Sequence, residues 1–350
     1  MNGCDVSDEF LRFHGDVDAA NAHLDFAVNV RGTEPPPWLL EALTEELSNI
    51  ASYPSARAEQ QARQAVADFH GIPASHVLLL AGAAEGFSLL PRLVPAGGSA
   101  LAVHPSFTEP EYALRAAGVP VVRLLLDAPF TLPASLPNGV DMAVVGNPTN
   151  PTGVLHDPAR LLTWDVPHLV VDEAFMDVAG EEHSLAARVV DNPQLIVLRS
   201  LTKTWALAGL RCGYVLAQPE VLARLSAGRP HWPLGSVQLR AIAEVMRRGP
   251  AAAEQIAGDV ARERAAMVRY LEDEGFRVVA GSSAPFVLVR PPTLDPESAR
   301  LRLLDRGVAV RRCDTFPGLD QGFWRLAVRD MDAVQHLLEE YRQVVKELVV

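Results

Sequence analysis

The segment LIVLRSLTK, at residues 195–203, joins an apolar run to a polar cluster that contains a lysine. Two earlier segments have the same design: MAVVGNPTNPTG at 142–153 and HLVVDEAF at 168–175. Short apolar runs bounded by turn-forming or polar residues are typical of strands buried on both faces of a parallel sheet. The three segments therefore predict strands of an α/β domain.

Polar residues follow each of these strands. Asn150, Asp172 and Lys203 lie at or shortly after the strand ends. In open α/β sheets ligands bind beyond the carboxyl ends of the strands, so these side chains can meet at one edge. Each residue alone has a structural explanation, because asparagine favours turns and aspartate caps helices. Their occurrence together favours a ligand site.

Further apolar runs alternate with helical stretches through the first two thirds of the chain. Strands are predicted at 77–80, 100–103, 119–126, 141–145, 168–171, 195–198 and 213–217. Helices are predicted at 84–93 and 109–117, and others from Pro37 and over 56–70 precede the first strand of this series. This alternation predicts an α/β fold with a mostly parallel sheet covered by helices.

The chain after Trp232 has a different pattern. It predicts helices at 234–247 and 251–274, strands at 276–279, 286–290, 308–312 and 323–328, and a final helix over 334–345. Together with an N-terminal strand at 24–30, these elements predict a smaller α+β domain. We therefore expect a large domain over 46–235 and a small domain formed by the two chain ends, 1–45 and 236–350.

The lysine content singles out one residue. Of the 31 basic residues, only Lys203 and Lys346 are lysines. Arginine stays protonated and cannot form a Schiff base, whereas lysine can. Lys346 lies on the helical pattern near the end of the chain, where a surface position is expected. Lys203 is therefore the candidate for covalent chemistry.

Bulk properties exclude several functions. The net charge of -12 offers no general basic face to nucleic acid, and no apolar run approaches the ~18 residues of a membrane span. The N-terminus lacks the apolar stretch of a signal peptide. Cys4, Cys212 and Cys313 have neither disulfide nor zinc spacing and suit a reducing compartment, so we expect a cytoplasmic protein without a metal site.

The three motifs carry a family resemblance. N-P-T-N-P-T-G at 147–153, D-E-A-F at 172–175, and S-L-T-K at 200–203 with Arg211 eight residues on resemble the fold-type I aminotransferases of class I and II. The resemblance runs from about His14 to about Arg329. Within this family the chain is similar to the branch that contains histidinol-phosphate aminotransferase and the L-threonine-O-3-phosphate decarboxylase of cobalamin biosynthesis. It implies a pyridoxal 5'-phosphate enzyme of fold type I.

The resemblance implies roles for the residues at the strand ends. Lys203 would hold the cofactor as a Schiff base, and Asp172 would keep the ring nitrogen protonated. Asn150 would bind the 3-oxygen of the ring. The cofactor phosphate would be held by Gly82, Ala83, Ala84, Ser200, Thr202 and Arg211.

Other matching residues would complete the site. Phe107 would stack on the cofactor ring, and Arg325 would pair with the substrate α-carboxylate. Tyr53 would reach the cofactor phosphate of a neighbouring subunit, which implies a homodimer with shared active sites. Phe175 takes the place of a tyrosine that is usual in the family's aminotransferases, so it has no hydroxyl to offer the 3-oxygen. The sequence LAGAAE at 80–85 departs from the common G-N-G-x-x-E but keeps the phosphate-binding amides.

The N-terminus bears on the reaction. FHGDVDAANAHLDFAVNV at 13–30 resembles the H-G-G…L-D-F-S-x-N-I opening of threonine-phosphate decarboxylases, which implies that His14 and Gly15 help to hold a substrate phosphate. Asp16 departs from the second glycine, and its carboxylate should repel a phosphate. Because of the His14-Gly15 opening, and although Asp16 argues against it, we favour the decarboxylase, with an aminotransferase of the histidinol-phosphate type as the alternative. The expected substrate is a small amino acid or amino acid phosphate.

The alternative that is not an enzyme is a catalytically silent relative that binds pyridoxal phosphate. Such a protein should have lost Lys203 or Asp172, and both are present. The sequence leaves the choice between decarboxylation and transamination open, because that choice depends on which Cα bond lies perpendicular to the ring.

Overall fold

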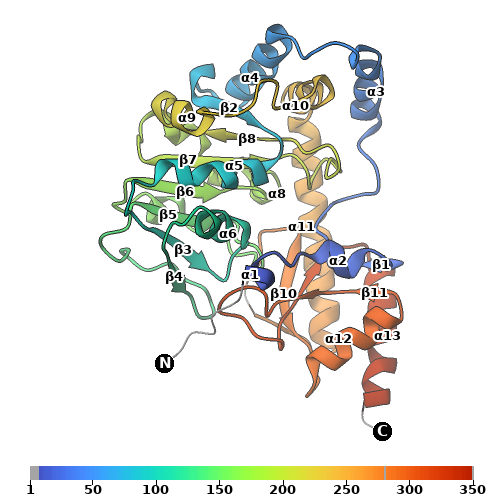
Figure 1. The fold of residues 1–350 in the computed structure, drawn as a ribbon. Helices are drawn as coiled ribbons and strands as arrows, with labels where there is room; N and C mark the ends of the chain where they lie inside the picture. The colour runs from blue at the N-terminus through green and yellow to red at the C-terminus, as the bar shows by residue number, and fades with distance from the viewer. Residues whose placement is uncertain (1–7, 280, 349–350) are drawn as a thin grey trace.

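A seven-stranded mixed sheet forms the centre of the larger part of the molecule (Figure 1). The strand order is β2-β8-β7-β6-β5-β3-β4, and β8 runs in the opposite direction to the other six strands. The strands are β2 (Val77–Leu80), β3 (Ala100–His104), β4 (Val121–Leu125), β5 (Met142–Gly146), β6 (His168–Asp172), β7 (Leu195–Ser200) and β8 (Gly213–Leu216). The computed structural model describes residues 8–279 and 281–348.

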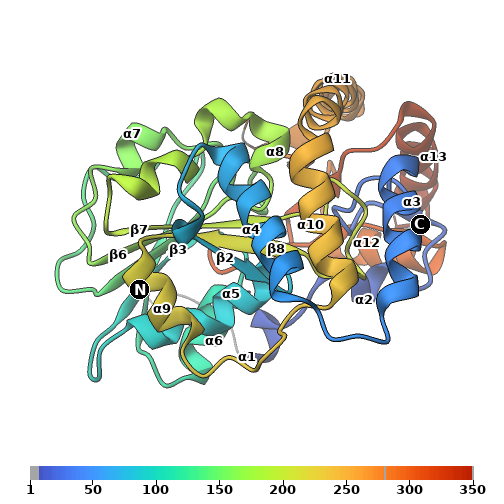
Figure 2. The same cartoon turned by 90° about the horizontal axis from the view of Figure 1, so that it is seen from above.

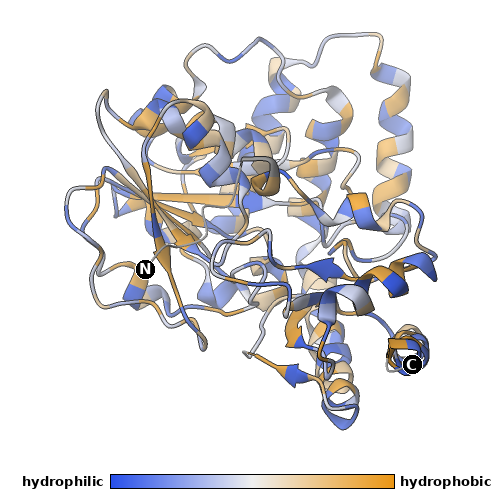
Figure 3. Cartoon of the chain, turned by 60° about the horizontal axis from the view of Figure 1, so that its bottom comes forward, coloured by the Kyte–Doolittle hydropathy of each residue, from blue (hydrophilic) through white to orange (hydrophobic). Residues whose placement is uncertain are grey.

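Both faces of this sheet are buried. Successive residues of a strand point to opposite faces, and in β5 Met142 and Val144 enter one apolar core while Ala143 and Val145 enter the other. The strands are accordingly apolar along their length, as Figure 3 shows by colour. The expected mostly parallel α/β sheet is confirmed.

Helices cover the sheet on its two faces (Figure 2). One layer contains α5, α6 and α9, and the other contains α4, α7, α8 and α10. Their bounds are α4 (Ala56–His70), α5 (Ala83–Leu89), α6 (Glu109–Ala116), α7 (Pro158–Leu161), α8 (Met176–Ala179), α9 (Pro219–Ser226) and α10 (Ser236–Arg248). Short 3-10 turns lie at Leu47–Asn49, Ala74–His76, Leu90–Leu93, Glu181–His183 and Ala186–Val190. Gly71 ends α4 in the left-handed conformation, at φ +65°, as expected for a glycine stop.

A smaller part is built on a four-stranded antiparallel sheet, in the order β12-β13-β10-β9. It contains β9 (Arg277–Val278), β10 (Phe286–Arg290), β12 (Arg311–Arg312), β13 (Trp324–Ala327), α12 (Pro296–Asp305) and α13 (Met331–Leu348). The 24-residue helix α11 (Pro250–Asp273) runs from α10 to this sheet (Figure 1). The expected smaller α+β unit is therefore present.

The N-terminal segment joins the two parts. It contains α1 (Asp8–Leu11), α2 (Gly15–Ala19), β1 (Leu24–Asp25) and α3 (Pro37–Glu46). The strand predicted at 24–30 covers only Leu24–Asp25, which pairs in parallel with β11 (Val308–Ala309). It ends there because the Asp25 carboxylate accepts the backbone amides of Ala27 and Val28 at 2.7 and 3.0 Å and turns the chain.

The proposed division at residues 46 and 235 crosses a shared core. Leu39 and Leu43 of α3 and Ile242 and Val245 of α10 pack in the same apolar cluster as α4. The division into 46–235 and the two chain ends thus remains a proposal, with α3 and α10 contributing to the core of the large sheet.

Other expectations concern the cysteines and membrane segments. Cys212 and Cys313 are buried and free, and Cys4 lies outside the described residues. None of the helices that the structure describes has the length and apolar content needed to cross a membrane.

Candidate active site

A pocket of about 440 Å³ opens at the carboxyl ends of β5, β6 and β7, beside the start of α5. Residues of the small sheet and of the N-terminal segment close it from the opposite side. It brings together most of the predicted site residues: His14, Gly15, Ala83, Ala84, Phe107, Asn150, Asp172, Phe175, Ser200, Thr202, Lys203, Arg211 and Arg325. The convergence expected from the strand ends is therefore present.

Asp172 ends β6 and opens onto the pocket. Its carboxylate accepts a hydrogen bond from the backbone amide of Ala174 at 3.2 Å, and it forms no ion pair among the residues that the structure describes. Burial raises its pKa from 3.8 to about 7, and the neighbouring charge of Glu173 acts in the same direction. A cationic group of a ligand placed beside this carboxylate would favour its charged form.

Lys203 follows β7 and faces the same pocket. Burial, together with the charges of Arg325 and Arg211, lowers the pKa of its ammonium from 10.5 to about 8. The backbone carbonyl of Lys203 accepts a hydrogen bond from the backbone amide of Arg31 at 3.0 Å, so the N-terminal segment helps to hold the loop after β7 that contains this lysine (the lysine loop). The amine is thereby prepared for nucleophilic attack near neutral pH.

The start of α5 and the lysine loop form a corner suited to a phosphate. Gly82 precedes α5 at φ +80°, a backbone conformation that favours glycine, and the missing side chain leaves room for Nη2 of Arg211, which would lie 3.0 Å from a Cβ there. The hydroxyls of Ser200 and Thr202 hydrogen-bond each other at 2.8 Å. Two hydroxyls, an arginine and the first amides of a helix suit a phosphate group.

The departure at LAGAAE has a structural consequence. The Glu85 carboxylate accepts the backbone amide of Ala81 at 2.7 Å and pairs with Arg229 at 2.8 Å. These contacts hold the turn before α5, so the glutamate keeps a positioning role although the preceding residues differ from the common pattern.

Aromatic residues form the walls of the pocket. The ring of Phe107 lies 5.4 Å from that of His14 and 5.9 Å from that of Phe87. Phe175 packs edge-on against Phe286, at 5.1 Å between ring centroids, and has no hydroxyl to offer a ligand. The pocket therefore has apolar surfaces suited to a planar ring.

Arg311 was missed by the sequence analysis. It is directly opposite Arg325 in the antiparallel ladder of β12 and β13, and both side chains are buried and reach the pocket. Arg325 donates to Asn150 Oδ1 at 2.6 Å and to the carbonyl of Ala27. Arg311 donates to the carbonyl of Phe13 at 2.8 Å, and its Nη1 has no partner among the described residues. Its position directly after the apolar run VAV at 308–310 is the sequence feature that could have identified Arg311 as a site residue.

His14 and Asp16 lie at the rim formed by α2. The Nε2 atom of His14 is 2.6 Å from Oε1 of Glu109. Gly15 is buried, and a Cβ there would lie 2.6 Å from the carbonyl oxygen of Ala27, so the sequence needs glycine at this contact. Asp16 is exposed and also lines the pocket.

Tyr53 lies apart from this pocket. Its side chain is 75% exposed and stacks on Trp232 at 4.3 Å between ring centroids. Tyr53 therefore does not line the pocket of its own chain as described. Its proposed role across a subunit interface stays a prediction.

The residues of the pocket fit pyridoxal phosphate. A carboxylate without a cation, an amine of lowered pKa and a phosphate corner occupy separate positions around one cavity with aromatic walls. These groups match, in turn, a protonated pyridine nitrogen, an aldehyde and a phosphate.

Comparisons with known proteins agree with this fit. Residues 22–340 match the family described as aminotransferase class I and II. A protein named histidinol-phosphate aminotransferase from Mycobacterium tuberculosis is 50% identical over 91% of this chain and 87% of its own length. A protein named threonine-phosphate decarboxylase from Salmonella typhimurium is 31% identical over 92% of this chain and 91% of its own length.

A solved structure shares the fold. Histidinol-phosphate aminotransferase from Sinorhizobium meliloti, in complex with pyridoxal-5'-phosphate, has a TM-score of 0.83 at 19% identity and covers 98% of this chain and 95% of its own. The fold-type I architecture expected from the motifs is confirmed. The chain therefore belongs to the class I and II aminotransferase family and is a pyridoxal-phosphate-dependent enzyme.

Proposed function

We propose that this enzyme is an aminotransferase that takes the amino group from a phosphorylated amine of the histidinol-phosphate type. The observation that carries the proposal is the pair of buried arginines, Arg311 and Arg325, on one face of the small sheet. Like charges directly opposite each other destabilise an antiparallel pair, and an anion between them offsets that cost. A phosphate dianion has the charge and the acceptor oxygens to do so.

The electrostatics of the pair support an anionic ligand. Burial, and next the charge of Arg311, lower the pKa of Arg325 to about 9, and burial lowers the pKa of Arg311 to about 10. The free Nη1 of Arg311 is a donor that a substrate oxygen can use. We assign the substrate phosphate to Arg311, with Arg325 alongside it.

Other side chains have proposed roles around the reacting carbon. Bound pyridoxal phosphate supplies an electron-poor ring that takes up the electron pair left at the substrate Cα. Asp172 keeps the ring nitrogen protonated, and Asn150 orients both the ring oxygen and Arg325. Lys203, once free, is placed to move the proton from Cα. Ser200, Thr202, Arg211 and the amides of Gly82, Ala83 and Ala84 hold the cofactor phosphate.

The decarboxylase remains the second candidate. The opening at 13–30 favoured it, and the relative from Salmonella typhimurium supports it at 31% identity. The relative named histidinol-phosphate aminotransferase is 50% identical over a similar share of the chain, so the aminotransferase alternative has the stronger support. The exposed Asp16 near the rim also disfavours a substrate that carries a phosphate and a carboxylate together.

Two parallel incubations of the holoenzyme without an amino acceptor test the proposal. L-Histidinol phosphate is expected to convert the bound cofactor to pyridoxamine phosphate, followed by the visible spectrum. L-Threonine O-3-phosphate is expected to release no carbon dioxide. Carbon dioxide from threonine phosphate, with an unchanged cofactor, would instead establish the decarboxylase.

A further inference from the structure

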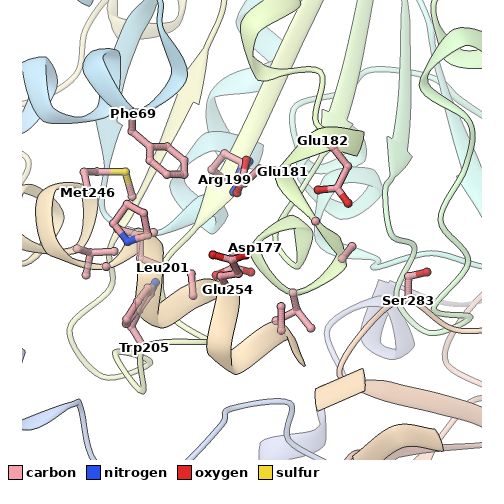
Figure 4. A pocket seen from close by; sticks show the side chains of 18 of the residues that line it. Phe69, Asp177, Glu181, Glu182, Arg199, Leu201, Trp205, Met246, Glu254 and Ser283 are labelled. Atoms are coloured by element: carbon pink, nitrogen blue, oxygen red, sulfur yellow. The ribbon is translucent and has the colours of Figure 1, made fainter. Parts of the chain in front are cut away.

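A second cavity, of about 550 Å³, lies between α8 and the junction of α10 with α11 (Figure 4). It shares no lining residue with the active-site pocket. Residues of the large part line it from α8 and β7, and residues of α11 together with Ser283 line it from the other side. Nothing in the reaction described above uses this cavity.

One end of the cavity is apolar. Phe69, Trp205 and Met246 lie together there, as Figure 4 shows, and Leu201 completes the wall. Helix α11 presents Ala253, Ala257 and Ala261 at four-residue spacing, and these small side chains leave the space open. A ligand body of hydrocarbon or aromatic character fits against this surface.

The other end is acidic. Asp177, Glu181, Glu182 and Glu254 line it. Buried Arg199 also reaches the cavity, and it is already matched by two carboxylates: it pairs with Glu181 and lies 3.4 Å from Glu173. The remaining cation, Arg264, donates to the carbonyl of Ala284 at 2.9 Å. The acidic end therefore carries excess negative charge.

Asp177 is the buried acidic residue that a ligand in this cavity would contact. Both of its carboxylate oxygens are buried, and neither has a donor in full hydrogen-bond geometry among the described residues; the hydroxyl of Thr204 is the side-chain donor that lies near them. Burial raises its pKa to about 6, although the charge of Arg199 and the nearby hydroxyl of Thr204 act in the opposite direction. A buried carboxylate with so little hydrogen bonding is costly, and a cationic ligand with an N–H group would offset that cost.

We propose that this cavity binds an organic ammonium compound, with the ammonium at Asp177 and an aromatic or aliphatic body against Phe69 and Trp205. No group of three or more acidic, histidine or cysteine side chains among residues 8–279 and 281–348 is arranged to hold a metal ion, so a bare metal cation is disfavoured. The volume is in the range of small-molecule sites.

The probe must avoid the chemistry of the active site. N,N-Dimethylphenethylamine is a tertiary amine, so it keeps one N–H donor when protonated but cannot link covalently to pyridoxal phosphate. We expect saturable binding of one probe per chain of the holoenzyme by calorimetry, with no change in the visible spectrum of the cofactor. The matched anion 3-phenylpropionate has the same apolar body and should bind at least tenfold more weakly.

Two variants locate the site. Asp177→Asn removes the charge with little change in shape and should weaken probe binding at least tenfold, whereas the matched control Asp332→Asn, at an exposed position of α13 outside the cavity, should change it less than about twofold. Ala257→Leu fills the cavity from α11 and should also abolish binding, which keeps the test valid if Asp177→Asn folds poorly. Absent binding at millimolar probe, equal binding of 3-phenylpropionate, or unchanged binding in Asp177→Asn or Ala257→Leu would overturn the proposal.

Discussion

The Nη1 atom of Arg325 donates a 2.6 Å hydrogen bond to the Oδ1 atom of Asn150. Arg325 belongs to β13 of the small sheet, and Asn150 lies in the turn after β5 of the large sheet. The bond therefore spans the active-site pocket and ties its two walls together. Because the Ala27 carbonyl accepts from Nη2, the guanidinium is held from two sides, and its orientation is set before a substrate arrives.

The first prediction concerns this fixed guanidinium. Arg325→Lys keeps the charge but loses the planar pair of donors, so one charge-assisted contact to the substrate should be lost. Such a contact contributes about 2 kcal/mol, or about thirtyfold in kcat/KM, and most of the change should appear in KM. Arg290→Lys is the matched control, since Arg290 pairs with Asp320 outside the pocket, and it should leave the kinetics unchanged. Equal kinetics for both variants would remove Arg325 from the substrate site.

The sequence could predict the centre of the site because its residues follow strand ends. Asn150, Asp172 and Lys203 lie at or after the carboxyl ends of β5, β6 and β7, and the apolar runs predict those three neighbouring parallel strands. The phosphate corner could be predicted as well, since it begins one turn after β2. These are local relationships between a strand and the residues that come after it.

Relationships between distant segments could not be predicted. The facing of Arg311 and Arg325 depends on the antiparallel register of β12 and β13, which apolar patterning over two residues does not specify. The contact of His14 with Glu109 joins residues 95 positions apart in the chain. The early end of β1 arises from a side-chain bond of Asp25, which a period-two pattern does not reveal.

A second prediction tests Lys203. Lys203→Arg keeps the charge but should abolish the covalent link to pyridoxal phosphate, seen as loss of the visible band and of borohydride-stable labelling. In the wild-type protein stripped of cofactor, the neutral amine is the attacking form, and its pKa is lowered to about 8. The rate of cofactor capture should therefore rise with pH up to about 8 and become constant above it. A capture rate that stays flat from pH 6 to 9 would contradict this reading of the lysine.

Asp172 carries the third prediction. Asp172→Asn removes the charge opposite the ring nitrogen, so turnover should fall by about 10²–10³ while the cofactor can still bind.

The stability of the cofactor-free protein gives an independent readout of Asp172. The pKa in the folded state is raised from 3.8 to about 7, so the folded state holds a proton that the unfolded chain has already lost. The resulting stabilisation is complete below about pH 4 and is lost as pH rises to about 7. The Asn variant should lack this pH dependence in urea unfolding, and an identical profile in both proteins would show that Asp172 is not buried as described.

A fourth prediction concerns Tyr53, which is exposed and remote from the pocket of its own chain. If it completes the site of a neighbouring subunit, the protein should be a dimer by light scattering. Mixing Tyr53→Ala with Lys203→Ala subunits should then restore activity, because one of the two shared sites in a hybrid dimer carries neither change. Activity no greater than that of the two parents, despite confirmed subunit exchange, would argue that each site belongs to one chain.

The last prediction separates Arg311 from its neighbour Arg312. Arg311 is 3% exposed and reaches the pocket, whereas Arg312 pairs with Asp314 at 2.5 Å. The two residues are adjacent on β12, so Arg311→Met and Arg312→Met remove the same charge and differ in the face of the strand that they change.

Arg311→Met should weaken binding of the phosphorylated substrate, because it removes the donor whose Nη1 is free. A charged hydrogen bond of about 1.5–3 kcal/mol corresponds to roughly 10- to 150-fold in KM. The same variant should hardly change the half-reaction with an amino acid that lacks a phosphate, since the cofactor residues are untouched. That comparison also distinguishes a binding role from a general loss of structure, because Arg311 holds the Phe13 carbonyl as well. If Arg311→Met and Arg312→Met reduce both half-reactions equally, the pair of arginines stabilises the strand, and the phosphate must be bound elsewhere.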